Sequence, residues 1–283
     1  MIRGAVPRQL FLSPSRMKSK SHHSALAAAI EAAQAAGKIM RQNLVSTNKR
    51  VNEATQHDIK LELDVRCQKL IERRLLKMDR GIAILGEEGV SGDPQARTRW
   101  VIDPIDGTVN FTYGIPHACV SIALDERLDV STRFGPAYQT VVGVVYDPFS
   151  DELFTAVRGE DSKLNGKRIQ VSSRTRLAES IVSLGFAKKR STLNRMLPNF
   201  VHLVPRVRKI RIMGAAALAM VYVASGRLDA YMEYGVRWWD IAAGGLILEM
   251  AGGDFQREQV SSDLTHRVLA NNGPIGKLLR RYY

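Results

Sequence analysis

The sequence predicts an α+β protein with two halves of different architecture. Two stretches near the N-terminus have helical periodicity, and short β-rich runs separated by turn signals follow them over about residues 82–157. From about residue 170 onward, strand and helix patterns alternate, which is typical of an α/β arrangement. We therefore expect an antiparallel sheet in the first half and a mixed sheet with helices in the second half.

Both early helical stretches have an apolar face. Residues 24–44 are rich in alanine, a strong helix former, and Leu26, Ile30 and Met40 fall on one stripe. Residues 58–78 combine an apolar face with a basic one, as expected of a helix that covers a sheet. The sequence thus predicts two surface helices before the first sheet.

The expected later elements are short. Strands of the first half are expected at residues 82–85, 100–102, 119–124, 140–146 and 153–157. Strands of the second half are expected near 180–184, 209–213 and 230–234, with helices near 215–225 and 240–250. We place the boundary near Asn165-Gly166, so that a disordered basic leader (1–20) precedes an N-terminal half (21–165) and a C-terminal half (166–283).

Length and composition fit an ordinary globular protein. With 283 residues, of which 45% are hydrophobic, the chain can bury a sizeable core as one large domain or two fused halves. Cys67 and Cys119 are far apart and form no CxxC motif, so we expect neither a disulfide framework nor a zinc site, and a reducing, cytoplasmic location. No apolar run approaches the roughly 20 residues that span a bilayer, so we expect no membrane partner.

The formal net charge of +13 is unevenly distributed. Residues 1–20 contain basic but no acidic side chains, and residues 174–211 hold a second basic cluster. These basic residues either form a solvated surface or attract phosphate compounds and nucleic acid. The first segment is equally consistent with a targeting peptide, a disordered leader or an upstream start codon.

Acidic residues from distant stretches suggest a metal site. Asp103 and Asp106 flank Pro104 in W-V-I-D-P-I-D-G-T-V-N-F (100–111), and they run directly into a glycine and a threonine. Carboxylate oxygens are the ligands that Mg²⁺ prefers, and a glycine leaves room for the close approach of an anion. This combination indicates phosphate chemistry.

Three further acidic segments would complete such a site. They are Asp64, Glu87-Glu88 and Asp240. Each also has a structural alternative: a solvated helix residue, an exposed acidic turn and the N-cap of the last long helix, respectively. A buried cluster of carboxylates is tolerable when cations neutralise it, so we expect these residues to converge on metal ions.

With these motifs the chain resembles the inositol monophosphatase family of the lithium-sensitive, Mg²⁺-dependent sugar-phosphatase superfamily. The resemblance depends on Gly86-Glu87-Glu88, on residues 100–111 and on W-D-I-A-A-G-G-L-I-L-E-M-A-G-G (239–253), and it extends from about residue 25 to near the end. It implies a layered αβαβα sandwich, a homodimer and a small phosphorylated polyol or sugar as substrate.

The resemblance also implies a role for each site residue. The implied ligands of two or three Mg²⁺ ions are Glu87, Asp103, the backbone carbonyl of Ile105, Asp106 and Asp240, with Asp64 beside the weakest ion. The implied catalytic residues are Glu87, Asp106 and Thr108, of which Thr108 helps to orient the attacking water. The implied substrate-binding residues are Gly107, Thr108, Ala216, Glu233 and Asp240.

The implied reaction is hydrolysis of myo-inositol monophosphate to inositol and phosphate by metal-activated water. The same chemistry on histidinol phosphate, fructose 1,6-bisphosphate or a 3′-phosphoadenosine nucleotide is an alternative. A different class of function, binding of nucleic acid or of a transcription complex through the basic surface, is also open.

Two departures from the family pattern affect substrate and metal preference. Glu62 stands near where the family commonly has a threonine, before Asp64. Ala215 stands where a serine or threonine is frequent, which removes a hydroxyl near the substrate.

Overall fold

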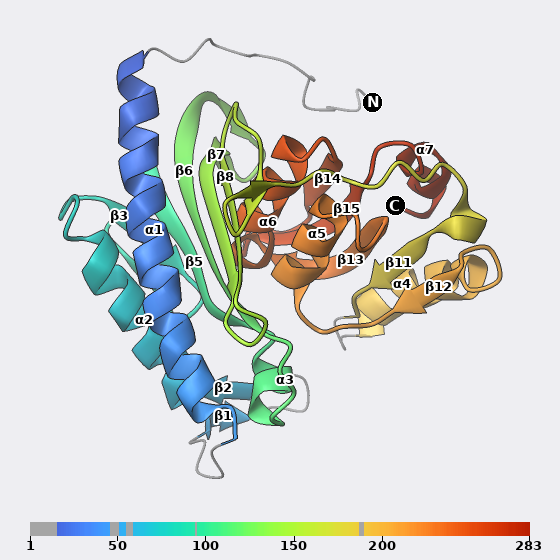
Figure 1. The fold of residues 1–283 in the computed structure, drawn as a ribbon, viewed down its shortest axis with the longest axis horizontal. Coiled ribbons are helices and arrows are strands. Elements are labelled where there is room, and N and C mark those ends of the chain that lie inside the picture. Colours follow the sequence, from blue (N-terminus) through green and yellow to red (C-terminus); the bar gives the residue numbers. More distant parts are fainter. Residues whose placement is uncertain (1–15, 46–50, 55–58, 94, 187–189) are drawn as a thin grey trace.

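The computed structural model is a stack of five layers (Figure 1). Helices α1 and α2 form one outer layer, an eight-stranded sheet the second, α5 and α6 the third, a five-stranded sheet the fourth, and α4 and α7 the fifth. The structure describes residues 16–45, 51–54, 59–93, 95–186 and 190–283. The layered αβαβα sandwich is therefore confirmed.

The first sheet is almost entirely antiparallel, with strand order β10-β9-β8-β7-β6-β5-β3-β4. Its strands are β3 (Ala83–Gly86), β4 (Gly89–Ser91), β5 (Thr98–Asp106), β6 (Cys119–Thr132), β7 (Gly135–Asp147), β8 (Glu152–Val157), β9 (Lys163–Leu164) and β10 (Lys167–Arg168). The exception is the parallel pair β3 and β5, which brings the carboxyl ends of these two strands together.

Two helices cover the outer face of this sheet. They are α1 (Arg16–Asn43) and α2 (Glu62–Leu75). Alanines of α1, including Ala29 and Ala36, are fully buried against the sheet beside Trp100. Helix α1 begins inside the segment that we expected to be a leader, and residues 1–15 lie outside the described residues.

The second sheet is mixed, with strand order β12-β11-β13-β15-β14. Its strands are β11 (Ile181–Leu184), β12 (Lys209–Arg211), β13 (Ala230–Arg237), β14 (Asp254–Gln259) and β15 (Thr265–Asn271). Strands β12, β11 and β13 are parallel, and β15 and β14 are antiparallel to their neighbours. Helices α4 (Arg190–Leu203) and α7 (Gly276–Leu279) pack on its outer face, where a separate apolar cluster forms.

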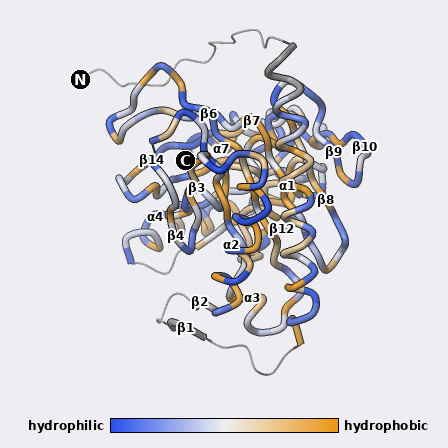
Figure 2. Tube along the Cα trace, turned by 90° about the vertical axis from the view of Figure 1, so that its left-hand side faces the viewer, coloured by the Kyte–Doolittle hydropathy of each residue, from blue (hydrophilic) through white to orange (hydrophobic). Residues whose placement is uncertain are grey.

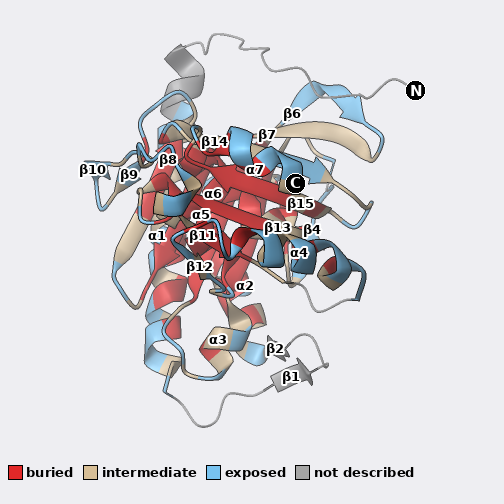
Figure 3. Ribbon diagram, turned by 90° about the vertical axis from the view of Figure 1, so that its right-hand side faces the viewer, coloured by how far each residue is buried: buried red, intermediate tan, exposed pale blue. Residues whose placement is uncertain are grey.

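The central layer has no polar face. Helices α5 (Ala216–Ala224) and α6 (Trp238–Met250) are buried between the two sheets, as Figure 3 shows by their red colour. Their apolar character continues around the helix because both sides meet a sheet. The hydropathy view likewise shows hydrophobic segments concentrated in the interior (Figure 2).

Several elements differ from the sequence prediction. Strand β2 (Ile59–Leu61), which pairs with β1 (Val51–Ala54) in a small sheet, occupies the start of the helix expected over 58–78. A short helix, which we expected the Gly107 and Thr108 amides to open, is present as α3 (Thr108–Thr112), whereas the sequence did not predict α4, β14 or β15. Asn165-Gly166, taken as a domain boundary, is the turn between β9 and β10, so the first sheet extends to Arg168. Among the described residues, no helix is long and apolar enough to span a membrane.

Candidate metal and phosphate site

Asp103 and Asp106 occupy the end of β5, where the chain turns from the first sheet toward the central helices. Both carboxylates are buried, with 2% and 7% of the residue exposed, respectively. Asp103 Oδ1 accepts a hydrogen bond from the Ile105 N–H at 3.0 Å, and the Ile105 carbonyl accepts one from Thr108 Oγ1 at 2.9 Å. The turn therefore holds Asp103, Ile105, Asp106 and Thr108 in one short structure.

Helix α5 binds the second of these aspartates with its first amides. The N–H groups of Ala216 and Ala217 donate to the two carboxylate oxygens of Asp106 at 3.1 and 2.7 Å. A helix N-terminus is a favourable place for negative charge because its amides lack partners within the helix. We expected the Ala216 amide for substrate, whereas here it is engaged by Asp106.

The parallel pairing of β3 with β5 determines where Glu87 lies. Gly86 at the end of β3 pairs with Ile102 of β5, and the Glu87 N–H donates to the Ile102 carbonyl at 3.1 Å. Glu87 therefore lies beside Asp103, although 16 positions separate them in the sequence. Glu87 and Glu88 are half-buried in the β3–β4 turn, so the alternative of an exposed acidic turn is wrong.

Asp240 comes to the same place from the other side. It is the third residue of α6, and its Oδ2 accepts the N–H of Arg237 at 2.7 Å, which ties the carboxylate to the helix start. Asp240 is therefore not the N-cap that the structural alternative proposed. Its neighbour Trp239 accepts a hydrogen bond from Ser121 of the first sheet through its carbonyl.

Electrostatics show that these four carboxylates lie within reach of one another. Burial raises the pKa of Asp103 well above its usual value, and the charges of Glu87, Asp106 and Asp240 raise it further, as does a hydrogen bond to Glu87. Burial and the charges of Glu87 and Asp106 also raise the pKa of Asp240. The pKa of Asp106 rises to about 6 through burial, which the α5 amides partly offset. Asp103, Asp106 and Asp240 thus resist ionisation unless positive charge is supplied.

The described residues hold no closed metal-coordination shell. No three His, Cys, Asp or Glu side chains of the described chain are gathered closely enough to form one. The donor set nonetheless fits a hard divalent cation, because it consists of carboxylate oxygens and one backbone carbonyl. The carboxylates that repel one another here are those that cations would draw together.

Glu233 lies at the far end of the site. It points from β13, where the Tyr231 hydroxyl donates to Glu233 Oε2 at 2.5 Å, and the charge of Asp106 contributes to its pKa. Burial, the largest cause, raises the pKa of Glu233 to about 7. A Cβ at Gly185 would fall 1.5 Å from the same oxygen, so this glycine makes room for the carboxylate.

Gly107 and Thr108 connect β5 to the short helix α3. Gly107 has a φ of 92°, in the left-handed region, and a Cβ there would lie 2.9 Å from the His117 carbonyl. Only glycine fits both conditions. The backbone amides expected to bind phosphate thus belong to a turn whose geometry depends on this residue.

Asp64 enters the region from a separate helix. It is 2% exposed in the first turn of α2, so the alternative of a solvated helix residue is wrong. Burial is the main cause that raises the pKa of the nearby Cys67 thiol to about 12, and the charge of Asp64 adds to it. The role of Asp64 beside a weak third metal ion stays a prediction.

Sequence reasoning missed the residues that support the site. Tyr231 is one, and its signal was the Y-M-E spacing, because residues two apart on a strand share a face. Asp125 is another: it is fully buried and accepts a hydrogen bond from the indole N–H of Trp238, the first residue of α6, at 2.8 Å. Nothing in the sequence near Asp125 indicates this distant partner.

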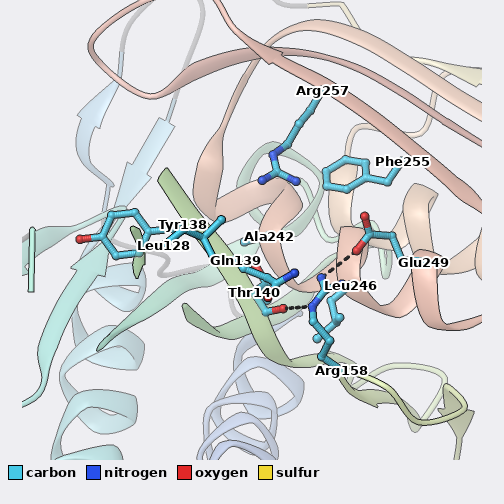
Figure 4. Close-up of a pocket in the computed structure, with 10 residues that line it drawn as sticks. All are labelled: Leu128, Tyr138, Gln139, Thr140, Arg158, Ala242, Leu246, Glu249, Phe255 and Arg257. Atoms are coloured by element: carbon cyan, nitrogen blue, oxygen red, sulfur yellow. Dashed lines mark hydrogen bonds and ion pairs between the residues drawn. The ribbon is translucent and has the colours of Figure 1, made fainter. Parts of the chain in front are cut away.

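A hollow of about 130 Å³ is lined by residues of β7, α6 and β14 (Figure 4). Arg158 crosses it, with hydrogen bonds to the Thr140 carbonyl at 2.7 Å and to Glu249 at 2.8 Å. None of the predicted site residues lines this hollow.

Comparison with known proteins defines the class to which this fold and site belong. Residues 21–280 match the model of the inositol monophosphatase family, and the chain belongs to that family. It is a phosphoric monoester hydrolase family, so the chain is an enzyme of this class.

Individual relatives carry two kinds of name. The chain is 40% identical to the Nus factor SuhB of Pasteurella multocida over 80% of this chain and 82% of the relative. It is 35% identical to inositol monophosphatase 1 of Solanum lycopersicum over 88% and 90%, respectively. Among solved structures, the extragenic suppressor protein SuhB of Bartonella henselae has a TM-score of 0.80 at 31% identity, and covers 92% of this chain and 98% of its own. The inositol monophosphatase of Anabaena has a TM-score of 0.77 at 32% identity, with 92% and 95% covered.

Proposed function

We propose that this chain is a Mg²⁺-dependent phosphomonoesterase that hydrolyses myo-inositol monophosphate to inositol and phosphate. The observation that supports it most is the gathering of Glu87, Asp103, Asp106 and Asp240, where burial, and after it the charges of the neighbouring carboxylates, raise the pKa of Asp103 and of Asp240. A protein tolerates such a cluster when cations neutralise it. Family membership supplies the reaction class.

The cluster, with the Ile105 carbonyl, would hold the Mg²⁺ ions, two or three per site. When bound, Mg²⁺ lowers the pKa of water and stabilises negative charge on phosphate and leaving-group oxygens. The protein's own share is to fix its ligands before substrate arrives. The α5 amides do this for Asp106, and the Arg237 amide does it for Asp240.

The remaining residues bind and orient. Glu87 and Thr108 hold the attacking water in line with the scissile bond, because correct orientation lowers the entropic part of the barrier. The amides of Gly107 and Thr108 donate to phosphate oxygens. Glu233 accepts hydrogen bonds from substrate hydroxyls, and the Tyr231 hydroxyl holds its carboxylate in place.

Phosphate release from a panel of substrates tests the proposal. Purified protein with Mg²⁺ is assayed on myo-inositol monophosphate, histidinol phosphate, fructose 1,6-bisphosphate and a 3′-phosphoadenosine nucleotide. We expect the highest kcat/KM for the inositol ester, with no activity in EDTA and inhibition by lithium. Preference for another ester would make the named substrate wrong, and activity that survives EDTA would contradict the metal.

A second function is favoured by the relatives named Nus factor SuhB and by the net charge of +13. In this function a homodimer binds RNA or a transcription complex through the basic surface, in the cytoplasm, while it retains the phosphatase site. RNA retention that falls with rising salt would support it. Absence of RNA binding at low salt would contradict the binding of RNA. A monomer in sedimentation would contradict the homodimer.

A further inference from the structure

A second pocket lies on the outer face of the second sheet, which faces away from the central helices. It has a volume of about 240 Å³ and is bounded by β13, β15, α4 and the C-terminal residues. Three arginines and three tyrosines dominate its lining, and we call it the arginine–tyrosine pocket: Arg195, Arg267, Arg281, Tyr234, Tyr282 and Tyr283. Since a water molecule occupies about 30 Å³ of liquid, the space admits a phosphate group with solvent.

Each arginine is placed over the ring of one tyrosine. Arg195 lies 4.8 Å from the Tyr234 ring centre, and Arg281 lies 4.8 Å from that of Tyr282. Arg267 lies 4.6 Å from the centre of the Tyr283 ring. A guanidinium attracted to an aromatic face loses freedom before any ligand binds, which lowers the entropic cost of binding.

Two of these positive charges are not neutralised by the protein. Arg267 forms an ion pair with Glu258, whereas no acidic side chain of the described residues lies within 4.0 Å of Arg195 or Arg281. Glu233 is the acidic residue of the lining, but its carboxylate lies with the Tyr231 hydroxyl on the opposite face of β13 from Tyr234. The pocket therefore presents net positive charge to a ligand.

The pocket adjoins the carboxylate site but faces a different layer. Tyr234 and Arg267 are cross-strand partners, so their side chains share one face of the sheet, toward α4. Glu233 lines the pocket and also interacts electrostatically with Asp106. Glu233 alternates with Tyr234 along β13, so its carboxylate faces the central layer, and a ligand in the pocket would lie across this strand from substrate bound at the carboxylates.

We propose that the arginine–tyrosine pocket binds a phosphate group. Arginine is suited to phosphate because its planar fork of donors matches the oxygens of the anion. The phosphate belongs either to a substrate with two phosphates or to a separate phosphorylated compound. Both sources share the same chemistry at the pocket.

Titration with inorganic phosphate in EDTA tests the pocket without relying on the proposed function. Without metal, the carboxylate cluster repels a phosphate dianion, so calorimetric binding at low salt reports the pocket. We expect binding by the parent and at least a roughly tenfold weaker affinity in the double variant Arg195→Ala/Arg281→Ala, because each arginine contributes charged hydrogen bonds. The control Arg280→Ala removes a neighbouring arginine that pairs with Asp254 and does not line the pocket; it should bind as the parent does.

Kinetics with Mg²⁺ distinguish the two sources, and this second measurement rests on the proposed function. If the pocket takes a substrate phosphate, the double variant raises KM for fructose 1,6-bisphosphate about tenfold and leaves KM for inositol monophosphate unchanged. If the ligand is a separate compound, both KM values stay unchanged while the affinity for inorganic phosphate falls.

The pocket proposal is overturned if the parent does not bind phosphate in EDTA, or if the double variant binds it as tightly as the parent does. Absence of turnover on every ester would contradict the proposed function alone, since the titration would still decide the pocket.

Discussion

Asp125 and Asp103 are both buried aspartates of the first sheet, but the groups that surround their carboxylates are opposite in charge. Asp125 is fully buried and accepts hydrogen bonds from Thr140 and Trp238, each at 2.8 Å, with Arg99 at 3.4 Å. Asp103 instead faces other carboxylates. Where a carboxylate holds the fold together, the chain supplies its donors and its cation.

Asp229, which directly precedes β13 of the second sheet, has surroundings like those of Asp125. It is fully buried and bonds to Ser172, to Arg174 at 3.0 Å and to the Ile181 amide at 2.7 Å. The contrast teaches that burial alone does not identify a functional carboxylate. The partners of the carboxylate make the difference, and those of Asp103 are other carboxylates, as the proposed metal site requires.

The largest expected effect is on turnover. Asp103→Asn removes a charge from the cluster while the amide oxygen can still accept the Ile105 N–H, so the local turn should survive. We expect kcat/KM for inositol monophosphate at saturating Mg²⁺ to fall by about 10³-fold, since a lost metal ligand costs several kcal/mol of transition-state stabilisation. Asp125→Asn is the matched control, and its kcat should stay within about threefold of the parent. An equal loss of turnover in both variants would contradict the different roles assigned to the two aspartates.

The free energy of unfolding should respond in the reverse order, with the larger loss in Asp125→Asn. Asp125→Asn removes the buried negative charge that faces Arg99, which is itself 7% exposed, and we expect the free energy of unfolding to fall by about 3 kcal/mol. Asp103→Asn in EDTA should leave that free energy unchanged or raise it, because it removes a repelled buried charge. Urea unfolding measures both. A metal-free Asp103→Asn protein that is less stable than Asp125→Asn would contradict the account.

The pH dependence of stability sharpens the same comparison. The pKa of Asp106 is about 6 in the folded protein, and an unfolded aspartate has a pKa of about 3.9. Because folding raises this pKa, the stabilising contribution is complete below about pH 4 and is lost as pH rises through about 6.

In EDTA we therefore expect the unfolding free energy of the parent, relative to Asp106→Asn, to fall by about 3 kcal/mol between pH 4 and 7. Saturating Mg²⁺ should abolish the fall, because the ions bind the charged form. Urea titrations at each pH provide the measurement, and a difference that does not change with pH would contradict the raised pKa that burial gives Asp106.

A smaller effect is expected at the rim of the site. Gly185→Ala would place a methyl group against the carboxylate of Glu233 and displace it. We expect KM for inositol monophosphate to rise about tenfold with little change in kcat, as for loss of a binding contact alone. Glu233→Gln should give a similar split, whereas a parental KM in both variants would remove Glu233 from substrate binding.

Local patterns in the sequence explain what could be predicted. Residues 24–44 and the apolar runs of the first sheet have periodicities that a single segment reveals. The two aspartates around Pro104 were found because their type and spacing suit one chemistry. Family motifs then named Glu87 and Asp240, which the folded chain brings to the same place.

The missed features depend on contacts between distant segments. Helix α4 contains Pro198 and follows a run of basic residues, so its pattern was read as surface charge. Strand β14 lies at a sheet edge, where its polar sequence is tolerated. The hydrogen bond from the Trp238 indole to Asp125 joins residues 113 positions apart, and no local sequence pattern indicates it.

Anomalous diffraction from crystals grown with Mn²⁺ in place of Mg²⁺ tests the central claim most directly. The account predicts at least two anomalous peaks enclosed by the carboxylates of Glu87, Asp103, Asp106 and Asp240, and their loss in Asp103→Asn. Peaks elsewhere on the protein, with none among these four side chains, would contradict it.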